Sequence, residues 1–121
     1  MDLQALFDTA MKASSASYSP YSKFRVGAAL LCADGSVVTG TNVENRSFGL
    51  TICAERSALV SAVSQGKTQF VAIAIACPDA AYPVSPCGAC RQVLSEFADQ
   101  DMPVVFGCRA DTVVHSTMGA L

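Results

Sequence analysis

The sequence is poor in charged residues, and its positive charge is not concentrated anywhere. Lys, Arg, Asp and Glu make up 15% of the 121 residues, and the formal net charge at pH 7 is -2. Proteins that bind a nucleic-acid backbone present clustered Lys and Arg side chains to the phosphates. We therefore expect no nucleic-acid partner.

Long hydrophobic runs are missing too. No stretch approaches the roughly 18 uninterrupted apolar residues of a membrane-spanning helix. The first residues, Met1 to Gln4, lack the positive region followed by an apolar one that marks a signal peptide. We expect a cytoplasmic protein without membrane contact, built as one domain over residues 1–121. Hydrophobic residues make up 51% of the chain, which leaves apolar surface for subunit contacts.

Six cysteines in a cytoplasmic chain need an explanation other than disulfides. Three of them end apolar runs and are predicted to be buried core thiols: Cys32, Cys77 and Cys108. The other three stand where helices are predicted to begin: Cys53, Cys87 and Cys90. The single histidine, His115, lies far from them in the last predicted strand, so we expect it to be structural or exposed.

The hydrophobic periodicity predicts an α/β protein. Its expected helices run from Leu3 to about Ser14, over 53–65 and over 87–97. Its expected strands cover 24–33, 37–42, 70–77, 103–108 and 112–116. The first two strands should form a hairpin at Asp34-Gly35. We predict a mixed five-stranded sheet with helices on its faces.

The spacing of the three cysteines at predicted helix starts indicates a metal-binding or redox site. Cys87 and Cys90 are three apart at a helix start, which places both sulfurs on one face of the first turn. Helix N-termini stabilise thiolates, and Cys53 opens a second helix. Zinc held by three thiolates would keep a fourth position for water, with Glu55 beside it as a proton carrier. A redox pair of the thioredoxin kind stays open for Cys87 and Cys90.

Four blocks of sequence, in order, resemble one family. They are Tyr21 to Ala29, Gly40 to Asn45, Cys53 to Arg56 and Pro86 to Gln92. The chain resembles cytidine deaminases of the small class in which three cysteines hold zinc, and such zinc deaminases are a standard example of this chemistry. The resemblance implies a three-layer cytidine-deaminase-like fold with helices on both faces of the sheet. It also implies hydrolytic deamination of cytidine and deoxycytidine to uridine and deoxyuridine, with release of ammonia, in pyrimidine salvage.

The resemblance also assigns roles at the site. It implies one zinc per chain, bound by Cys53, Cys87 and Cys90, with Glu55 as the catalytic acid and base. Substrate contacts are implied for Phe24, Asn42, Glu44, Ala54 and Ser85. Phe24 would stack on the pyrimidine, the Asn42 and Glu44 side chains would bind the ribose 3'-hydroxyl, and the backbone at Ala54 and Ser85 would read the base edge.

Two arginines adjoin the cysteines, and several blander interpretations stay open. Arg56 and Arg91 could donate to the sulfurs, or they could be surface arginines. Phe24 could belong to the strand core, and Asn42 and Glu44 could be turn residues. Glu55 could simply interact with the helix dipole.

Competing functions are a deaminase for another aminopyrimidine nucleoside such as blasticidin S, an RNA-editing deaminase, and a non-catalytic zinc-binding domain.

The resemblance further implies a homotetramer whose active sites include residues from neighbouring subunits. It places an aromatic tail beyond the point where this chain stops at Leu121, and without that tail we expect the base to be less covered.

Overall fold

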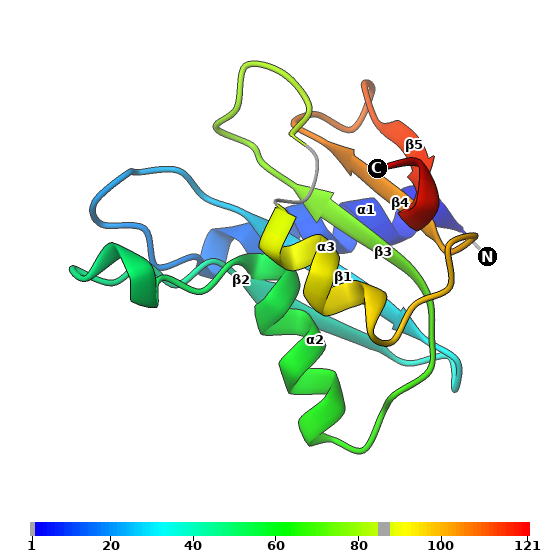
Figure 1. The fold of residues 1–121 in the computed structure, drawn as a ribbon. Coiled ribbons are helices and arrows are strands. Elements are labelled where there is room, and N and C mark those ends of the chain that lie inside the picture. Colours follow the sequence, from blue (N-terminus) through cyan, green and yellow to red (C-terminus); the bar gives the residue numbers. More distant parts are fainter. Residues whose placement is uncertain (1, 85–87) are drawn as a thin grey trace.

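The computed structural model describes residues 2–84 and 88–121. Figure 1 shows the helices and strands in chain order. They are α1 (Leu3–Ala13), β1 (Gly27–Cys32), β2 (Val37–Thr41), α2 (Ala54–Ser64), β3 (Phe70–Ala76), α3 (Gly88–Ser95), β4 (Pro103–Gly107) and β5 (Val114–Thr117), with short 3-10 helices η1 (Ser14–Ala16), η2 (Phe48–Leu50) and η3 (Met118–Ala120).

The five strands form one mixed sheet in the order β2-β1-β3-β4-β5. The β3–β4 pair is parallel, and the other three pairs are antiparallel. The β1–β2 hairpin turns at Gly35, whose φ of 88° suits glycine. The predicted five-stranded mixed sheet and its hairpin are thus confirmed.

Helices cover both faces of this sheet, because side chains along each strand alternate between the faces. In β3, Ala72 and Ala74 pack in a cluster with Phe7 of α1. The intervening Ile73 and Ile75 belong to the cluster that contains α2 and Leu94 of α3. Figure 1 shows α2 and α3 on one face and α1 on the other. The predicted three-layer arrangement is confirmed.

A glycine in β2 lets α2 lie directly on the sheet. A Cβ atom at Gly40 would stand 2.3 Å from the Ala58 nitrogen and 2.7 Å from the Ala54 oxygen, both backbone atoms of α2. No side chain fits at that separation, so the first turns of α2 contact the strand backbone. This contact fixes where the helix N-terminus lies relative to the sheet.

The prediction that the first strand begins at Phe24 is wrong, because β1 begins at Gly27. The Val26 oxygen still accepts from the Asn42 backbone nitrogen at 3.2 Å, but other backbone groups of this segment bond to the Asn42 side chain. Asn42 Nδ2 donates to the Phe24 oxygen at 2.8 Å, and the Val26 nitrogen donates to Asn42 Oδ1 at 3.0 Å. These bonds pull the segment out of the β ladder.

Two other boundaries differ from the prediction by two residues. Helix α3 ends at Ser95 and not at Phe97, because the Phe97 nitrogen donates to the Leu94 oxygen in a tighter turn. Strand β5 begins at Val114, since the Thr112 nitrogen closes a turn on the Arg109 oxygen. His115 lies in β5 and is exposed, as predicted.

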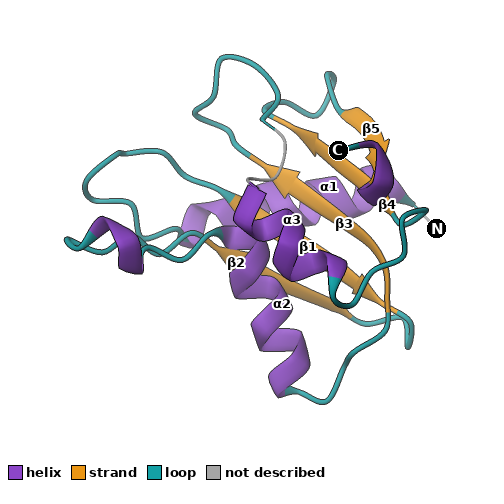
Figure 2. Ribbon diagram, in the orientation of Figure 1, coloured by secondary structure: helices purple, strands orange, loops and turns teal. Residues whose placement is uncertain are grey.

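Several connections meet at one end of the sheet. Gly27, the first residue of β1, pairs with Thr41 at the end of β2 and with Ala76 at the end of β3. The loops before β1, after β2 and after β3 therefore leave the sheet together, as Figure 2 shows. In the described part of the chain, none of the helices has the length and apolarity to cross a membrane.

Candidate active site

A cavity of about 250 Å³ opens at this end of the sheet. It brings together side chains from segments that lie far apart in the sequence. Six predicted site residues line it: Phe24, Asn42, Glu44, Cys53, Ala54 and Glu55. Two other predicted site residues, Ser85 and Cys87, lie outside the described residues.

The N-terminus of α2 delivers a thiol and a carboxylate to the cavity. Cys53 is the N-cap residue, with extended backbone angles, and Glu55 lies in the first turn. Glu55 is only 5% exposed, which is unusual for a carboxylate because burial of a charge is unfavourable without compensating interactions. The partial positive charge of a helix N-terminus is one such interaction for a carboxylate in the first turn.

Arg56 joins the cysteines of two helices. Its Nη2 donates to Cys53 Sγ at 3.6 Å. The pKa of Arg56 is raised, mainly by this hydrogen bond, and the Cys90 thiol raises it further. Cys90 is fully buried in α3. Two predicted zinc ligands, one from α2's start and one from α3, therefore lie near one guanidinium.

The described thiols suit a thiolate-binding metal. Among residues 2–84 and 88–121, no three His, Cys, Asp or Glu side chains come together as a metal-ligand group, and the third predicted ligand, Cys87, falls outside these ranges. Arg56 Nε is nevertheless buried without a hydrogen-bond partner in the described part of the chain. An arginine that donates to Cys53 Sγ and also interacts with Cys90 can offset part of the negative charge that thiol ligands bring to a metal. The donor set present therefore fits zinc.

The Asn42 side chain, 8% exposed, holds the Phe24 segment as well as lining the cavity. Its Oδ1 accepts from the Val26 nitrogen and from Ser17 Oγ, and its Nδ2 donates to the Phe24 oxygen. Both lone pairs of Oδ1 are thus used, whereas Nδ2 carries a second hydrogen. Asn42 therefore has a structural role in the turn and also lines the cavity.

The Glu44 carboxylate fastens the loop before Phe24. Its Oε1 accepts from the Tyr21 and Ser22 nitrogens, both at 3.1 Å, and its Oε2 accepts from Ser22 Oγ. These hydrogen bonds, led by the one from the Ser22 hydroxyl, lower the pKa of Glu44. The group is therefore an anion at neutral pH, positioned at the cavity by the loop it holds.

Comparison with known proteins gives one consistent answer. The family model described as the cytidine and deoxycytidylate deaminase zinc-binding region matches residues 1–108. The chain belongs to this deaminase family. It is 53% identical to a cytidine deaminase of Halalkalibacterium halodurans over 88% of this chain and 80% of that protein. It is 51% identical to a cytidine deaminase of Sporosarcina psychrophila over 86% and 76% of the two chains.

A solved structure agrees with the sequence matches. The crystal structure of a cytidine deaminase from Burkholderia pseudomallei superposes with a TM-score of 0.92 at 44% identity, covering 98% of this chain and 94% of that one. The predicted family and fold are therefore both confirmed.

Part of the cavity wall is not predicted from the sequence. The missed lining residues are Val26, Thr51, Ile75, Cys77 and Val84. Cys77 is buried as predicted, but it also faces the cavity just beyond β3. Burial, with a smaller effect of the Glu55 charge, raises its pKa to about 12, so it stays a neutral thiol. Ligands often bind at the carboxyl ends of parallel strands, and that signal could have found it.

Arg91 follows Cys90 in α3 and is half-buried. Its predicted contact with the sulfurs stays a prediction.

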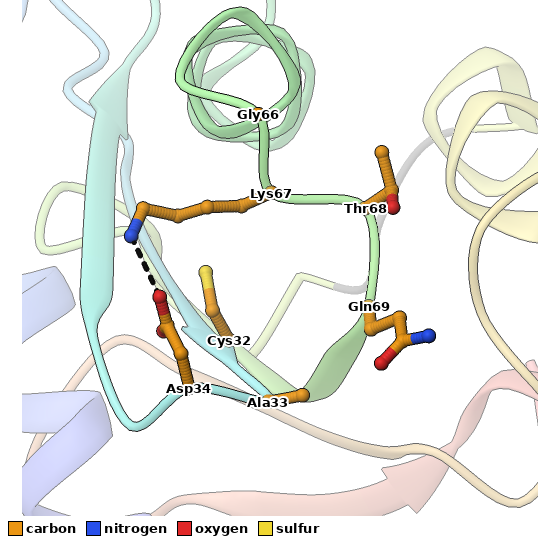
Figure 3. A pocket seen from close by; sticks show the side chains of 7 residues that line it. All are labelled: Cys32, Ala33, Asp34, Gly66, Lys67, Thr68 and Gln69. Carbon is orange, nitrogen blue, oxygen red and sulfur yellow. Dashed lines mark hydrogen bonds and ion pairs between the residues drawn. The ribbon is translucent and has the colours of Figure 1, made fainter.

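A second hollow, of about 200 Å³, lies at the opposite end of β1 and α2. It is lined by Cys32 to Asp34 from the hairpin and by Gly66 to Gln69 from the α2–β3 connection. Lys67 Nζ forms an ion pair with Asp34 Oδ2 at 2.8 Å, which Figure 3 shows. This ion pair is distant from the first cavity along both elements.

Proposed function

We propose that this chain hydrolyses cytidine and deoxycytidine to uridine and deoxyuridine, releasing ammonia, as a step of pyrimidine salvage. One observation carries the proposal. A buried carboxylate, Glu55, and a thiol, Cys53, share a cavity with the aromatic side chain of Phe24. An aromatic wall suits a flat base, and a protonatable group beside a metal-binding thiol suits a hydrolytic attack on that base.

Zinc is the implied cofactor, at one ion per chain. Cys53, Cys87 and Cys90 would hold it. When bound, zinc lowers the pKa of water and so supplies a hydroxide nucleophile at neutral pH. The guanidinium of Arg56 would offset part of the negative charge of three thiolates, and we assign the same role to Arg91.

Glu55 would carry the protons of the reaction. It takes a proton from the attacking water as the new bond to carbon 4 forms, and it gives that proton to ring nitrogen N3. It then transfers the second proton of the same water to the exocyclic nitrogen, which leaves as ammonia when its bond to carbon 4 breaks. One carboxylate can serve both steps because they occur in sequence.

The other cavity residues would bind the nucleoside. Phe24 forms the wall against the base. The backbone of Ala54, in the first turn of α2, has an N–H without an intrahelical acceptor that can bind the base edge, and we assign Ser85 to the same edge. Glu44 can accept a hydrogen bond from the ribose 3'-hydroxyl, and the second Nδ2 hydrogen of Asn42 can be donated to it.

The experiment is a product assay on the purified protein. We expect cytidine and deoxycytidine to yield uridine or deoxyuridine and equimolar ammonia, with activity lost in a chelator and restored by zinc. A non-catalytic zinc domain would bind zinc and produce no ammonia. Preferential turnover of blasticidin S would favour that aminopyrimidine nucleoside as the substrate, and turnover of RNA alone would favour an editing enzyme.

The ligand assignment has its own test. Cys53→Ala, Cys87→Ala and Cys90→Ala should each lose bound zinc and activity together. Cys108→Ala alters a buried thiol directly after β4 and should keep both. Full zinc in Cys87→Ala would contradict the assignment.

We also infer that residues 1–121 act as one deaminase domain in a cytoplasmic homotetramer. Exposed apolar side chains support the assembly. Val43 and Ile52 exchange backbone hydrogen bonds at 2.9 Å, and both side chains are exposed, as is that of Leu50. Val60 is exposed on α2, one of the two helices whose small residues we expect at the contacts. Light scattering that finds a fully active monomer would contradict the tetramer.

A further inference from the structure

The backbone just before β1 is held by side chains on both sides. Asn42 bonds Phe24 and Val26, as described above. The residue between them turns the other way: the Arg25 nitrogen donates to Asp79 Oδ2 at 2.8 Å. Side chains alternate along an extended segment, so Phe24 and Val26 line the cavity while Arg25 reaches outward to Asp79.

The contact between Arg25 and Asp79 is more specific than most surface ion pairs. Besides the backbone bond, Arg25 Nε donates to Asp79 Oδ2 at 3.0 Å and Nη2 donates to Oδ1 at 2.8 Å. A bidentate guanidinium–carboxylate pair fixes the relative orientation of both groups. The hydrogen bonds from Arg25 lower the pKa of Asp79 to about 2, so the pair is charged at neutral pH.

Asp79 stands on a tight turn that is itself fixed to the sheet. The Ala80 nitrogen donates to the Cys77 oxygen at 3.0 Å, and the Cys77 nitrogen donates to the Gly107 oxygen at 2.9 Å. Cys77 lines the cavity. The pair therefore joins two cavity walls that are 54 residues apart in the sequence.

The residue that precedes Phe24 adds a reason for such a clamp. Lys23 has a φ of 61°, a left-handed conformation that non-glycine residues rarely adopt. Such a conformation persists only when the surrounding contacts impose it. Glu44 imposes it from the Ser22 side, while Asn42 and Asp79 impose it from the other side.

We propose that Arg25 and Asp79 are positioning residues that hold Phe24 and the turn after β3 as the walls of the nucleoside site. The nature of the ligand rests on the proposed function, whereas the holding of Phe24 does not. A wall that contacts the base equally before and during reaction affects binding and leaves the chemical step nearly unchanged. Misplacing it lowers affinity without removing zinc or Glu55.

Kinetics of Asp79→Asn and of Arg25→Lys test the clamp in the 121-residue protein loaded with zinc. Arg25→Lys keeps the positive charge but cannot form the bidentate contact with the carboxylate. We expect KM for cytidine to rise about tenfold in each variant, with kcat within about threefold of wild type and zinc content unchanged. The double variant should show KM close to that of either single variant, because both changes break the same contact.

The Lys67–Asp34 ion pair provides the matched control, because its length is also 2.8 Å and it lies at the other end of β1. Asp34→Asn should leave KM and kcat at their wild-type values. Wild-type KM in Asp79→Asn would overturn the proposal. The proposal would also be overturned if Asp34→Asn and Asp79→Asn lost the same thermal stability and raised KM equally. In that case the rise in KM would follow from lost stability and not from the position of Phe24.

A readout independent of catalysis separates this proposal from the proposed function. The chain contains no tryptophan and three tyrosines, so Phe24→Trp introduces a single tryptophan at the wall, which can be excited selectively at wavelengths the tyrosines do not absorb. Adding Asp79→Asn should lower its anisotropy and shift its emission to the red, while adding Asp34→Asn should change neither. Unchanged fluorescence in Phe24→Trp/Asp79→Asn would overturn the clamp even in an active enzyme. An inactive wild type with this fluorescence response would overturn the proposed reaction alone.

Discussion

Arg56 Nη2 lies 3.6 Å from Cys53 Sγ, one turn along the same helix. The guanidinium also interacts with Cys90 in α3, so a single cation is shared by thiols from two helices. In the proposed site, three thiolates on a divalent ion would leave a net negative centre. A positive group that donates to these sulfurs lowers the charge on the ligands and fixes their orientation.

Arg56→Gln should therefore weaken zinc binding. Loss of a group that supports metal ligands typically costs 10- to 100-fold in metal affinity, and we expect a loss of about that size in competition with a chromogenic chelator. Arg109→Gln removes the same charge from an exposed position and should leave zinc affinity unchanged. Equal affinities in the two variants would show that Arg56 does not support the site.

Gly40→Ala should destabilise the protein, because its Cβ would collide with backbone atoms of α2 at 2.3 and 2.7 Å. Overpacking of this kind typically costs about 1–3 kcal/mol. Urea unfolding measures the loss, and zinc content shows whether the displaced helix still presents Cys53. Gly49→Ala is the control, since a Cβ there meets no atom within 4 Å. Equal stability of the two variants would contradict the close approach of α2.

Local sequence patterns were sufficient for most of the fold. The nearly continuous apolar run of β3 and the glycine-bounded helix at α2 are properties of neighbouring residues, so local sequence patterns find them. The bonds that remove Phe24 to Val26 from β1 come from Asn42 and Asp79, which are distant in sequence. No local pattern contains such tertiary contacts, and the strand start was therefore misplaced.

In the candidate site, too, some residues are predictable from local sequence and others depend on tertiary contacts. Cys53 and Glu55 were predicted because they open a helix and carry reactive groups. Cys77 was predicted to be a core thiol, which its burial supports, but its position on the cavity wall depends on how β3 meets α2. The sequence leaves open whether Asn42 has a structural role or binds substrate. Its three side-chain hydrogen bonds show that it holds the Phe24 segment in place.

The contribution of the Arg25–Asp79 pair to stability should depend on pH in a defined window. The pKa of Asp79 is lowered from 3.8 to about 2 in the folded state. A lowered carboxyl pKa stabilises the fold above the unfolded value and loses this effect as pH falls through the folded one. The difference in free energy of unfolding between wild type and Asp79→Asn should be constant from pH 7 to 5 and shrink between about 4 and 2. A difference that disappears already at pH 6 would contradict this assignment.

Ribose recognition should depend on the 3'-hydroxyl more than on the 2'-hydroxyl. Cytidine and 2'-deoxycytidine should both react, and 3'-deoxycytidine should have kcat/KM lower by about 10- to 100-fold, since a hydrogen bond to a charged group contributes about 1.5–3 kcal/mol. Asn42→Ala should impair all three nucleosides, because it also releases Phe24. Equal rates for cytidine and 3'-deoxycytidine would remove the sugar-binding role of Glu44 and Asn42.

The most direct test of the proposed reaction is to measure cytidine turnover and zinc per chain together in Glu55→Gln. Gln keeps the shape of the buried side chain but cannot carry a proton. We predict one zinc per chain with turnover reduced about 100- to 10,000-fold, the usual cost of losing general acid–base catalysis. Glu96→Gln, at an exposed position, should react like wild type. Near-normal turnover by Glu55→Gln would contradict the mechanism.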